Sequence, residues 1–164
     1  MTDAVVAYFS QTNDILATFL MSILPIVELR GSIIFAATQN VPWYIAYIVS
    51  VVGNILPIPF IILFLRPILN YLKKTKHLAK AADWIQERSM KKADKILKYE
   101  ILGLFIFVAI PLPGTGAWTG AIIASLLDMR IIKAFPTIVL GVMAAGVIMV
   151  LGSYGFWSVI THLF

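Results

Sequence analysis

The sequence predicts an all-α integral membrane protein, built as an inverted repeat in which each half is a re-entrant helical hairpin followed by a transmembrane helix. Of its 164 residues, 60% are hydrophobic and only 13% are charged. A soluble domain of this size could not bury so much apolar surface, and a disordered chain would be far more polar. The apolar residues form four stretches, at 15–38, 43–65, 101–127 and 134–160.

The first and third stretches are each interrupted at their centre by charged or helix-breaking residues. Each arm beside an interruption has roughly 8–11 residues, which is about 12–17 Å of helix, or half of a bilayer core. Either a re-entrant hairpin or a kinked full span fits this pattern. The interrupting residues are Pro25, Glu28, Arg30 and Gly31 in the first stretch, and Pro111, Pro113, Gly114 and Gly116 in the third.

The second and fourth stretches have the character of ordinary transmembrane helices. Residues 43–65 would form a helix of about 34 Å, which is long enough to cross a bilayer core. Each of the two helices is expected to begin just after a proline, Pro42 or Pro136, a position that a helix tolerates. Pro57 and Pro59 predict a kink within the first of them.

The distribution of positive charge favours the two hairpins over two full spans. Residues 66–98 hold ten Lys and Arg and three acids. With two hairpins, twelve of the thirteen Lys and Arg lie on the cytoplasmic side, and only Arg30 lies in the membrane. Two full spans would instead place Arg130 and Lys133 outside.

This topology divides the chain into a first repeat (1–66), a basic amphipathic cytoplasmic segment (67–98) and a second repeat (99–164). It predicts a multi-pass protein of the inner (cytoplasmic) membrane. Apolar residues recur at helical spacing in 72–98 among lysines, so this segment is expected to lie as a helix on the anionic inner leaflet. The alternative is a solvated hinge between the repeats.

Several classes of site are excluded by what the sequence lacks. There is no cysteine, so no disulfide framework or thiolate zinc site can form, and the two histidines, His77 and His162, are far apart. Neither an HExxH nor a GxSxG motif occurs. We therefore expect no enzyme activity, no metal and no cofactor, and no nucleic-acid partner for the basic segment.

Glu28 and Arg30 are the ionisable residues at membrane depth. A charge near the bilayer centre costs about 2.5–3.5 kcal/mol for Arg on insertion scales, so packing alone would not retain the pair. One interpretation is a mutual ion pair that fixes the hairpin tip. The other is a carboxyl that exchanges a proton beside a cationic hook for an anion, with Gly31 allowing close approach.

The third stretch contains a string of glycines that predicts an anion-binding helix terminus. Gly114 and Gly116 permit positive φ angles and close backbone approach. Thr115 or Gly116 would cap a helix running from Ala117 toward Leu127, whose N-terminal amides and dipole favour an anion.

Four further residues have weaker functional interpretations. Trp118 could wall a cavity or simply pack, and Thr119, like Thr115, could donate a hydroxyl group to a ligand or serve the helix terminus. Asp128 and Arg130, after this stretch, could gate access or form a surface ion pair. A stripe of small residues at Gly141, Ala145 and Gly152 predicts close helix packing or a dimer seam.

The strings PIVELRGSI (25–33) and PLPGTGAWTGA (111–121) resemble those of the small multidrug export protein family, which is distantly similar to the DedA/VTT superfamily of membrane proteins. The resemblance implies two re-entrant hairpins that face each other across an inverted repeat, and a proton- or sodium-coupled transporter. Glu28–Gly31 and Pro113–Gly116 match its two motifs. DedA-like relatives are linked to movement of lipids, including polyprenyl phosphate carriers, although this chain is shorter than typical DedA proteins.

Together these features predict a proton-coupled membrane transporter for an anionic or phosphate-bearing amphiphile such as a lipid. The alternatives are a small multidrug efflux protein, which would use Glu28 and Trp118, and a structural membrane protein without transport activity. An intramembrane enzyme has no supporting catalytic set. The expected partners are membrane lipids, a small-molecule or lipid substrate, a proton or sodium ion, and a second copy of the chain.

Overall fold

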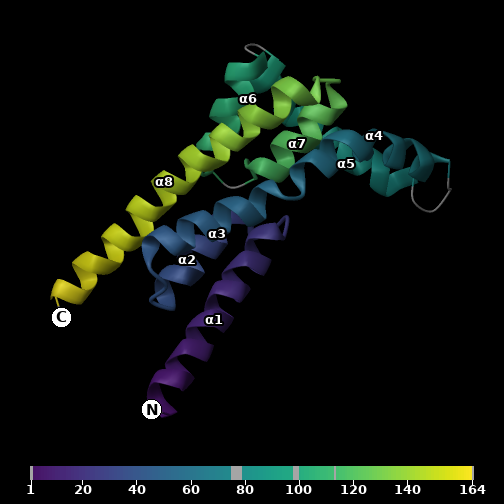
Figure 1. Ribbon diagram of the computed structural model, residues 1–164. Coiled ribbons are helices and arrows are strands. Elements are labelled where there is room, and N and C mark those ends of the chain that lie inside the picture. The colour runs from purple at the N-terminus through teal and green to yellow at the C-terminus, as the bar shows by residue number, and fades with distance from the viewer. Residues whose placement is uncertain (1, 75–78, 98–99, 113, 164) are drawn as a thin grey trace. The chain divides into compact units, whose positions relative to one another are not determined.

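A computed structural model describes residues 2–74, 79–97, 100–112 and 114–163 (Figure 1). Within these ranges the chain is all-helical and contains no strand, as the sequence predicted. The helices are α1 (Thr2–Ile23), α2 (Glu28–Thr38), α3 (Trp43–Ile55), α4 (Ile58–Lys73), α5 (Ala79–Leu97), α6 (Glu100–Ala109), α7 (Ala117–Leu126) and α8 (Ile131–Leu163).

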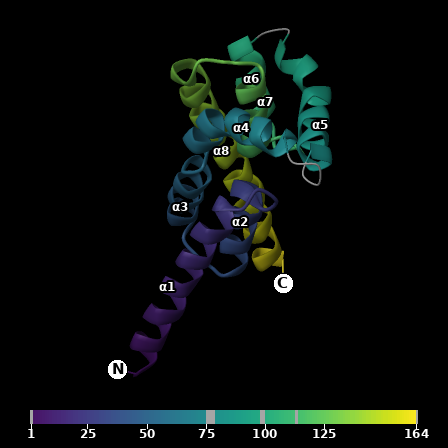
Figure 2. The same ribbon diagram turned by 90° about the vertical axis from the view of Figure 1, so that its right-hand side faces the viewer.

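The interruption of the first apolar stretch forms a tight turn between two packed helices. Helix α1 ends at Ile23 and α2 begins at Glu28, and the two helices lie side by side and contact α3 (Figures 1 and 2). The expected boundary at residue 15 is wrong for the helix, because α1 begins at Thr2. Its part Asn13–Ile23 forms an apolar helix, and the polar residues Ser10–Asp14 lie inside α1 because helix formation does not require apolar residues.

The start of α8 also differs from the prediction. The helix begins at Ile131, and Pro136 lies inside it. The backbone N–H groups of Lys133 and Ala134 both donate to the carbonyl of Arg130, at 2.9 Å, so the first turn is complete before the proline. A proline this close to a helix start removes a single ladder hydrogen bond, and the helix continues through it.

Pro57 interrupts the second apolar stretch, as expected. Helix α3 ends at Ile55 and α4 begins at Ile58. Two segments, Trp43–Leu65 and Ile131–Gly155, are nevertheless long and apolar enough to cross a membrane, with 23 and 25 residues. Their many exposed large apolar side chains would face lipid.

The basic segment forms helix α5 between Ala79 and Leu97. The Nζ of Lys91 lies 2.8 Å from Oε1 of Glu87, and the Arg88 guanidinium lies 5.1 Å from the ring centroid of the exposed Trp84. Of the remaining residues of the predicted helix 72–98, the first two belong to α4, Lys74 forms a turn, and 75–78 and 98 lie outside the described ranges.

The chain forms two compact units, and α8 contributes to both. Unit 1 comprises residues 1–56 and 142–164, where the Tyr154 hydroxyl donates to the carbonyl of Val41 at 2.7 Å and the Tyr47 hydroxyl donates to that of Met143 at 3.2 Å. Unit 2 comprises residues 57–141, where the Ser125 hydroxyl donates to the carbonyl of Ile62 at 3.2 Å.

Helices α2 and α7 end in the same way. Asn40 and Asp128, just past the two helices, have left-handed backbones with φ of 58° and 60°. The N–H of each donates to the carbonyl three residues earlier, and the N–H of the following residue donates to the carbonyl five residues earlier. This is the hydrogen-bond pattern of a Schellman-type helix end.

The helices that follow, α3 and α8, also contact their hairpins in the same way. A Cβ added at Gly53 of α3 would overlap Ser22 Oγ and lie 2.9 Å from the carbonyl oxygen of Phe19. A Cβ added at Gly141 of α8 would lie 2.7 Å from Val108 Cβ and 3.2 Å from the carbonyl oxygen of Phe105. A Schellman end followed by a glycine crossing therefore occurs in both halves of the chain, although the helices before the breaks differ in length, with 22 residues in α1 and 10 in α6.

Candidate functional site

Glu28 lies at the turn between α1 and α2 and is buried, with 6% of its surface exposed. Its N–H donates to the carbonyl of Leu24 at 2.9 Å, and its backbone is left-handed, with φ of 51°. This conformation costs a non-glycine residue about 1–3 kcal/mol, and glycine would adopt it freely. A buried glutamate at such a position indicates that its carboxyl group is needed there.

Arg30 follows two residues later and is half-buried. The charge of Glu28 acts on its guanidinium, so the turn holds the two groups within electrostatic reach of each other. Gly31 lies against the turn, because its N–H donates to the carbonyl of Val27 at 3.0 Å and an added Cβ would overlap a methyl group of the Val27 side chain.

The second break, in unit 2, has the glycine geometry that the sequence predicted. Gly114 and Gly116 have φ of 76° and 140°, and Gly116 is buried and precedes the first residue of α7. The Thr115 hydroxyl does not cap the helix. It lies 2.9 Å from the carbonyl oxygen of Ile110 and 2.8 Å from that of Leu112, so it fixes the loop. Pro113 lies outside the described residues.

The first turn of α7 carries the remaining predicted residues of this break. Trp118 and Thr119 are both half-buried, and the helix begins without a side-chain cap. A helix N-terminus with an uncapped first turn presents backbone N–H groups and the positive end of its dipole. Asp128 and Arg130 are exposed in the link to α8, where Asp128 forms the left-handed helix end.

The structure thus groups Glu28, Arg30 and Gly31 in unit 1, and the residues from Gly114 to Arg130 in unit 2. Sequence reasoning missed a set of buried polar side chains in unit 1. The Ser32 hydroxyl donates to Ser50 Oγ at 2.8 Å, and Oδ1 of the 2%-exposed Asn54 has no hydrogen-bond partner within the described residues. The sequence indicates these side chains by polar residues spaced four apart within apolar stretches. The pairs are Thr18 and Ser22, Glu28 and Ser32, and Ser50 and Asn54.

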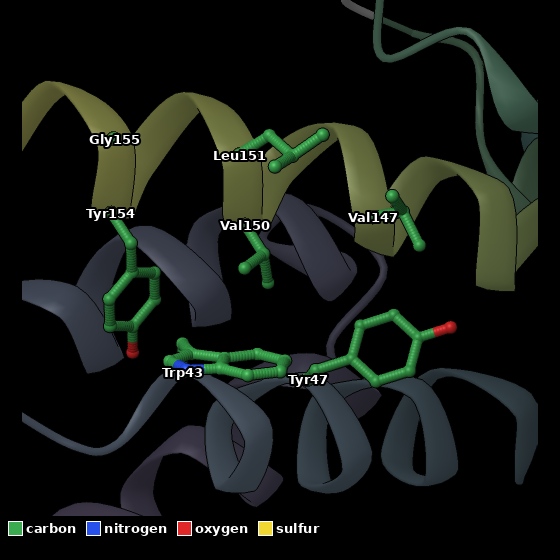
Figure 3. A pocket seen from close by; sticks show the side chains of 7 residues that line it. All are labelled: Trp43, Tyr47, Val147, Val150, Leu151, Tyr154 and Gly155. Atoms are coloured by element: carbon green, nitrogen blue, oxygen red, sulfur yellow. The ribbon is translucent and has the colours of Figure 1, made fainter.

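Unit 1 also contains an apolar cavity of about 370 Å³. In Figure 3, Trp43 and Tyr47 project from α3 on one side, and α8 supplies the side chains opposite. A cavity of this size and lining suits an apolar or aromatic molecule. The residues contributed by α8 are Val147, Val150, Leu151, Tyr154 and Gly155.

Residues 28–148 match the model of the family described as "Putative small multi-drug export protein". The chain belongs to this family. Its description and the two apolar spans identify a membrane protein of the transporter type. The matched region starts at Glu28, just after the first turn, and contains the whole of the second break, whereas no curated protein and no solved structure matches the chain.

Proposed function

We propose that this family member is a proton-coupled transporter of an anionic or phosphate-bearing amphiphile, such as a lipid. The observation that carries the proposal is the buried, left-handed Glu28 beside Arg30 at the break between two apolar helices. In the membrane, a carboxyl group beside an arginine can exchange a proton while the arginine binds an anion. Uncapped amides at the start of α7 offer a second group suited to anions.

The membrane arrangement that we propose is an inverted repeat of two re-entrant hairpins, each followed by a transmembrane helix. Support comes from the recurring helix ends at Asn40 and Asp128 and the recurring crossings at Gly53 and Gly141. In many secondary transporters, interrupted helices from two such repeats form the substrate site near the bilayer midplane. The arrangement also places the basic helix α5 on the cytoplasmic side, where it would contact anionic lipids.

A second candidate function is efflux of small apolar or aromatic drugs. The family description favours it, and so does the cavity that contains Trp43, Tyr47 and Tyr154, since aromatic side chains stack on planar ligands. In this alternative the apolar part of the substrate would occupy the cavity and Glu28 would remain the coupling group. An anionic amphiphile uses Arg30 as well, which a cationic drug would not.

The decisive experiment compares Glu28→Gln with the wild-type protein in proteoliposomes. Phospholipids, polyprenyl phosphates and aromatic dyes are screened for binding, and uptake of the binder is then measured with and without an imposed pH gradient. Because Gln mimics the protonated carboxyl, the variant should still bind substrate but lose the acceleration by the gradient. Full gradient-driven uptake by Glu28→Gln would show that Glu28 is only an ion-pair partner.

A further inference from the structure

We propose that Asn54 completes a buried proton site in the first repeat, in which its side-chain carbonyl accepts a hydrogen bond from the neutral carboxyl of Glu28. This inference deepens the proposed function, since it assumes that Glu28 exchanges a proton. It adds a positioning residue on a different helix and a reason why the protonated state is stable inside the membrane.

The first step is the unmet hydrogen-bonding capacity of Asn54. Its Oδ1 atom is buried and has no donor within the described residues, although buried polar atoms nearly always have one. An amide oxygen can accept from an N–H or an O–H group. Oδ1 of Asn54 can therefore accept a hydrogen bond from a neighbouring donor.

The second step is the register of helices α2 and α3, which pack against each other. Ser32 is bonded to Ser50, and Ala36 shares a buried cluster with Ala46, so residue numbers rise along α2 as they fall along α3. Residues four apart lie on one helix face. One turn beyond the Ser32–Ser50 pair, this register brings the backbone position of Glu28, the first residue of α2, opposite Asn54.

The third step compares the first repeat with the second. Matching the Schellman ends and the glycine crossings pairs Asn54 with Val142, and Ser50 with Ile138, at the same spacing along the chain. Every buried polar residue of the first hairpin and α3 has an apolar counterpart that is also buried. The pairs are Thr18 and Leu104, Ser22 and Val108, Glu28 and Gly116, Ser32 and Gly120, Ser50 and Ile138, and Asn54 and Val142.

This comparison is an internal control for the fold. The second repeat forms the same helix ends and crossings with apolar residues at these positions, so the architecture does not require the polar ones. Buried polar groups in a membrane protein are costly and mark functional sites. The shared helix ends and crossings therefore do not account for the buried carboxyl of Glu28 or the buried amide of Asn54.

Few charged or titratable groups surround the pair. Arg30 on α2 is the charge that acts on Glu28. The described side chains of α1 include one ionisable group, Asp14, more than two turns before the helix end at Ile23. Helix α3 carries Tyr44 and Tyr47 near its opposite end, and α8 carries Tyr154 within the described part of unit 1. Among the described side chains, Asn54 is thus the neutral group that this register presents to Glu28.

The chemistry requires no further reactant. An ionised Glu28 accepts hydrogen bonds only and cannot satisfy Asn54 Oδ1, whereas the protonated carboxyl gains one O–H donor. Proton uptake therefore supplies a donor for Oδ1, whereas in the ionised state the amide N–H groups of Asn54 can donate to the carboxylate. Replacing Asn54 should therefore change the hydrogen bond made by the neutral carboxyl group of Glu28.

The test measures Glu28 directly by infrared difference spectroscopy of the full-length protein in lipid bilayers across a pH series. The neutral carboxyl band lost in Glu28→Gln identifies the group. Asn54→Val introduces the side chain found at the equivalent position of the second repeat. Asn54→Thr introduces a side chain of the same shape as Val that restores an acceptor oxygen. Ser50→Ala, one turn away, is the control.

We expect Asn54→Val to shift the Glu28 band, Asn54→Thr to recover most of that shift, and Ser50→Ala to leave the band unchanged. An unchanged band and titration in Asn54→Val would overturn the role of Asn54 and leave proton coupling by Glu28 intact. Equal effects of Val and Thr would also overturn it, since the acceptor oxygen would then be irrelevant. If sodium chloride, but not pH, altered the band, the site would bind a cation in place of a proton.

Discussion

Replacing Gly53 by alanine tests the close crossing of α3 over α1. The new Cβ would overlap Ser22 Oγ and lie 2.9 Å from the Phe19 carbonyl oxygen, and a helix backbone cannot move away locally. Overpacking of this kind costs about 1–3 kcal/mol. For a chain of this length, that corresponds to a fall in Tm of about 2–12 °C, at roughly 2–4 °C per kcal/mol.

The assay is thermal unfolding of the purified protein in one detergent, with Gly152→Ala as the matched control. Nothing lies within 4 Å of a Cβ at Gly152, so that change should leave Tm unchanged or raise it slightly through better helix propensity. Adding Ser22→Ala to Gly53→Ala should recover part of the lost Tm, because it removes the Oγ atom that the new Cβ would overlap. If Gly53→Ala and Gly152→Ala unfolded at the same temperature, the two helices would not cross as closely as the structure shows.

Two further predictions concern the charges and the topology. Arg30→Ala should reduce substrate affinity about tenfold or more by removing a charged hydrogen bond. Arg130→Ala, at an exposed position, should change the affinity less than twofold. Equal effects in a binding assay would exclude Arg30 as the group that binds the anion. The chain has no native cysteine, so single cysteines at the exposed Gln39 and Ile132 can be labelled cleanly with a membrane-impermeant maleimide. We expect Gln39→Cys to react from outside the cell and Ile132→Cys only after permeabilisation, and reaction of Ile132→Cys from outside would show that the second hairpin crosses the membrane.

The breaks were predictable because their chemistry is local. Proline lacks an N–H, and glycine readily adopts positive φ angles, so the positions of Gly114, Gly116 and Pro57 indicated where helices end. The start of α1 at Thr2 was not predictable from hydropathy, which reports burial or lipid contact and says little about helix formation. The prediction that α8 begins just after Pro136 was wrong because the helix starts earlier, with hydrogen bonds to the carbonyl of Arg130, and tolerates a proline in its next turn.

The polar interior of unit 1 was harder to predict because it depends on register between helices distant in sequence. Ser32 and Ser50 are each unremarkable as single residues of an apolar stretch, and only their contact shows that α2 and α3 align polar positions. The missing partner of Asn54 is likewise invisible in the sequence, since it depends on every neighbouring donor being placed elsewhere. An unpartnered buried atom of this kind can be recognised only when the positions of the neighbouring donors are known.

The two repeats divide the chemistry that we propose between them. Where the first repeat has Glu28 and Arg30 at its break, the matching positions of the second are Gly116 and Trp118. Glycine at the first of these positions carries no charge and starts a helix that has no side-chain cap, so in this proposal the second repeat offers the positive end of a helix dipole to an anion without titrating. The first repeat then has a group whose charge can change. A coupled transporter needs both functions, and placing them on separate repeats lets a proton alter the charge of one binding partner while the other stays constant.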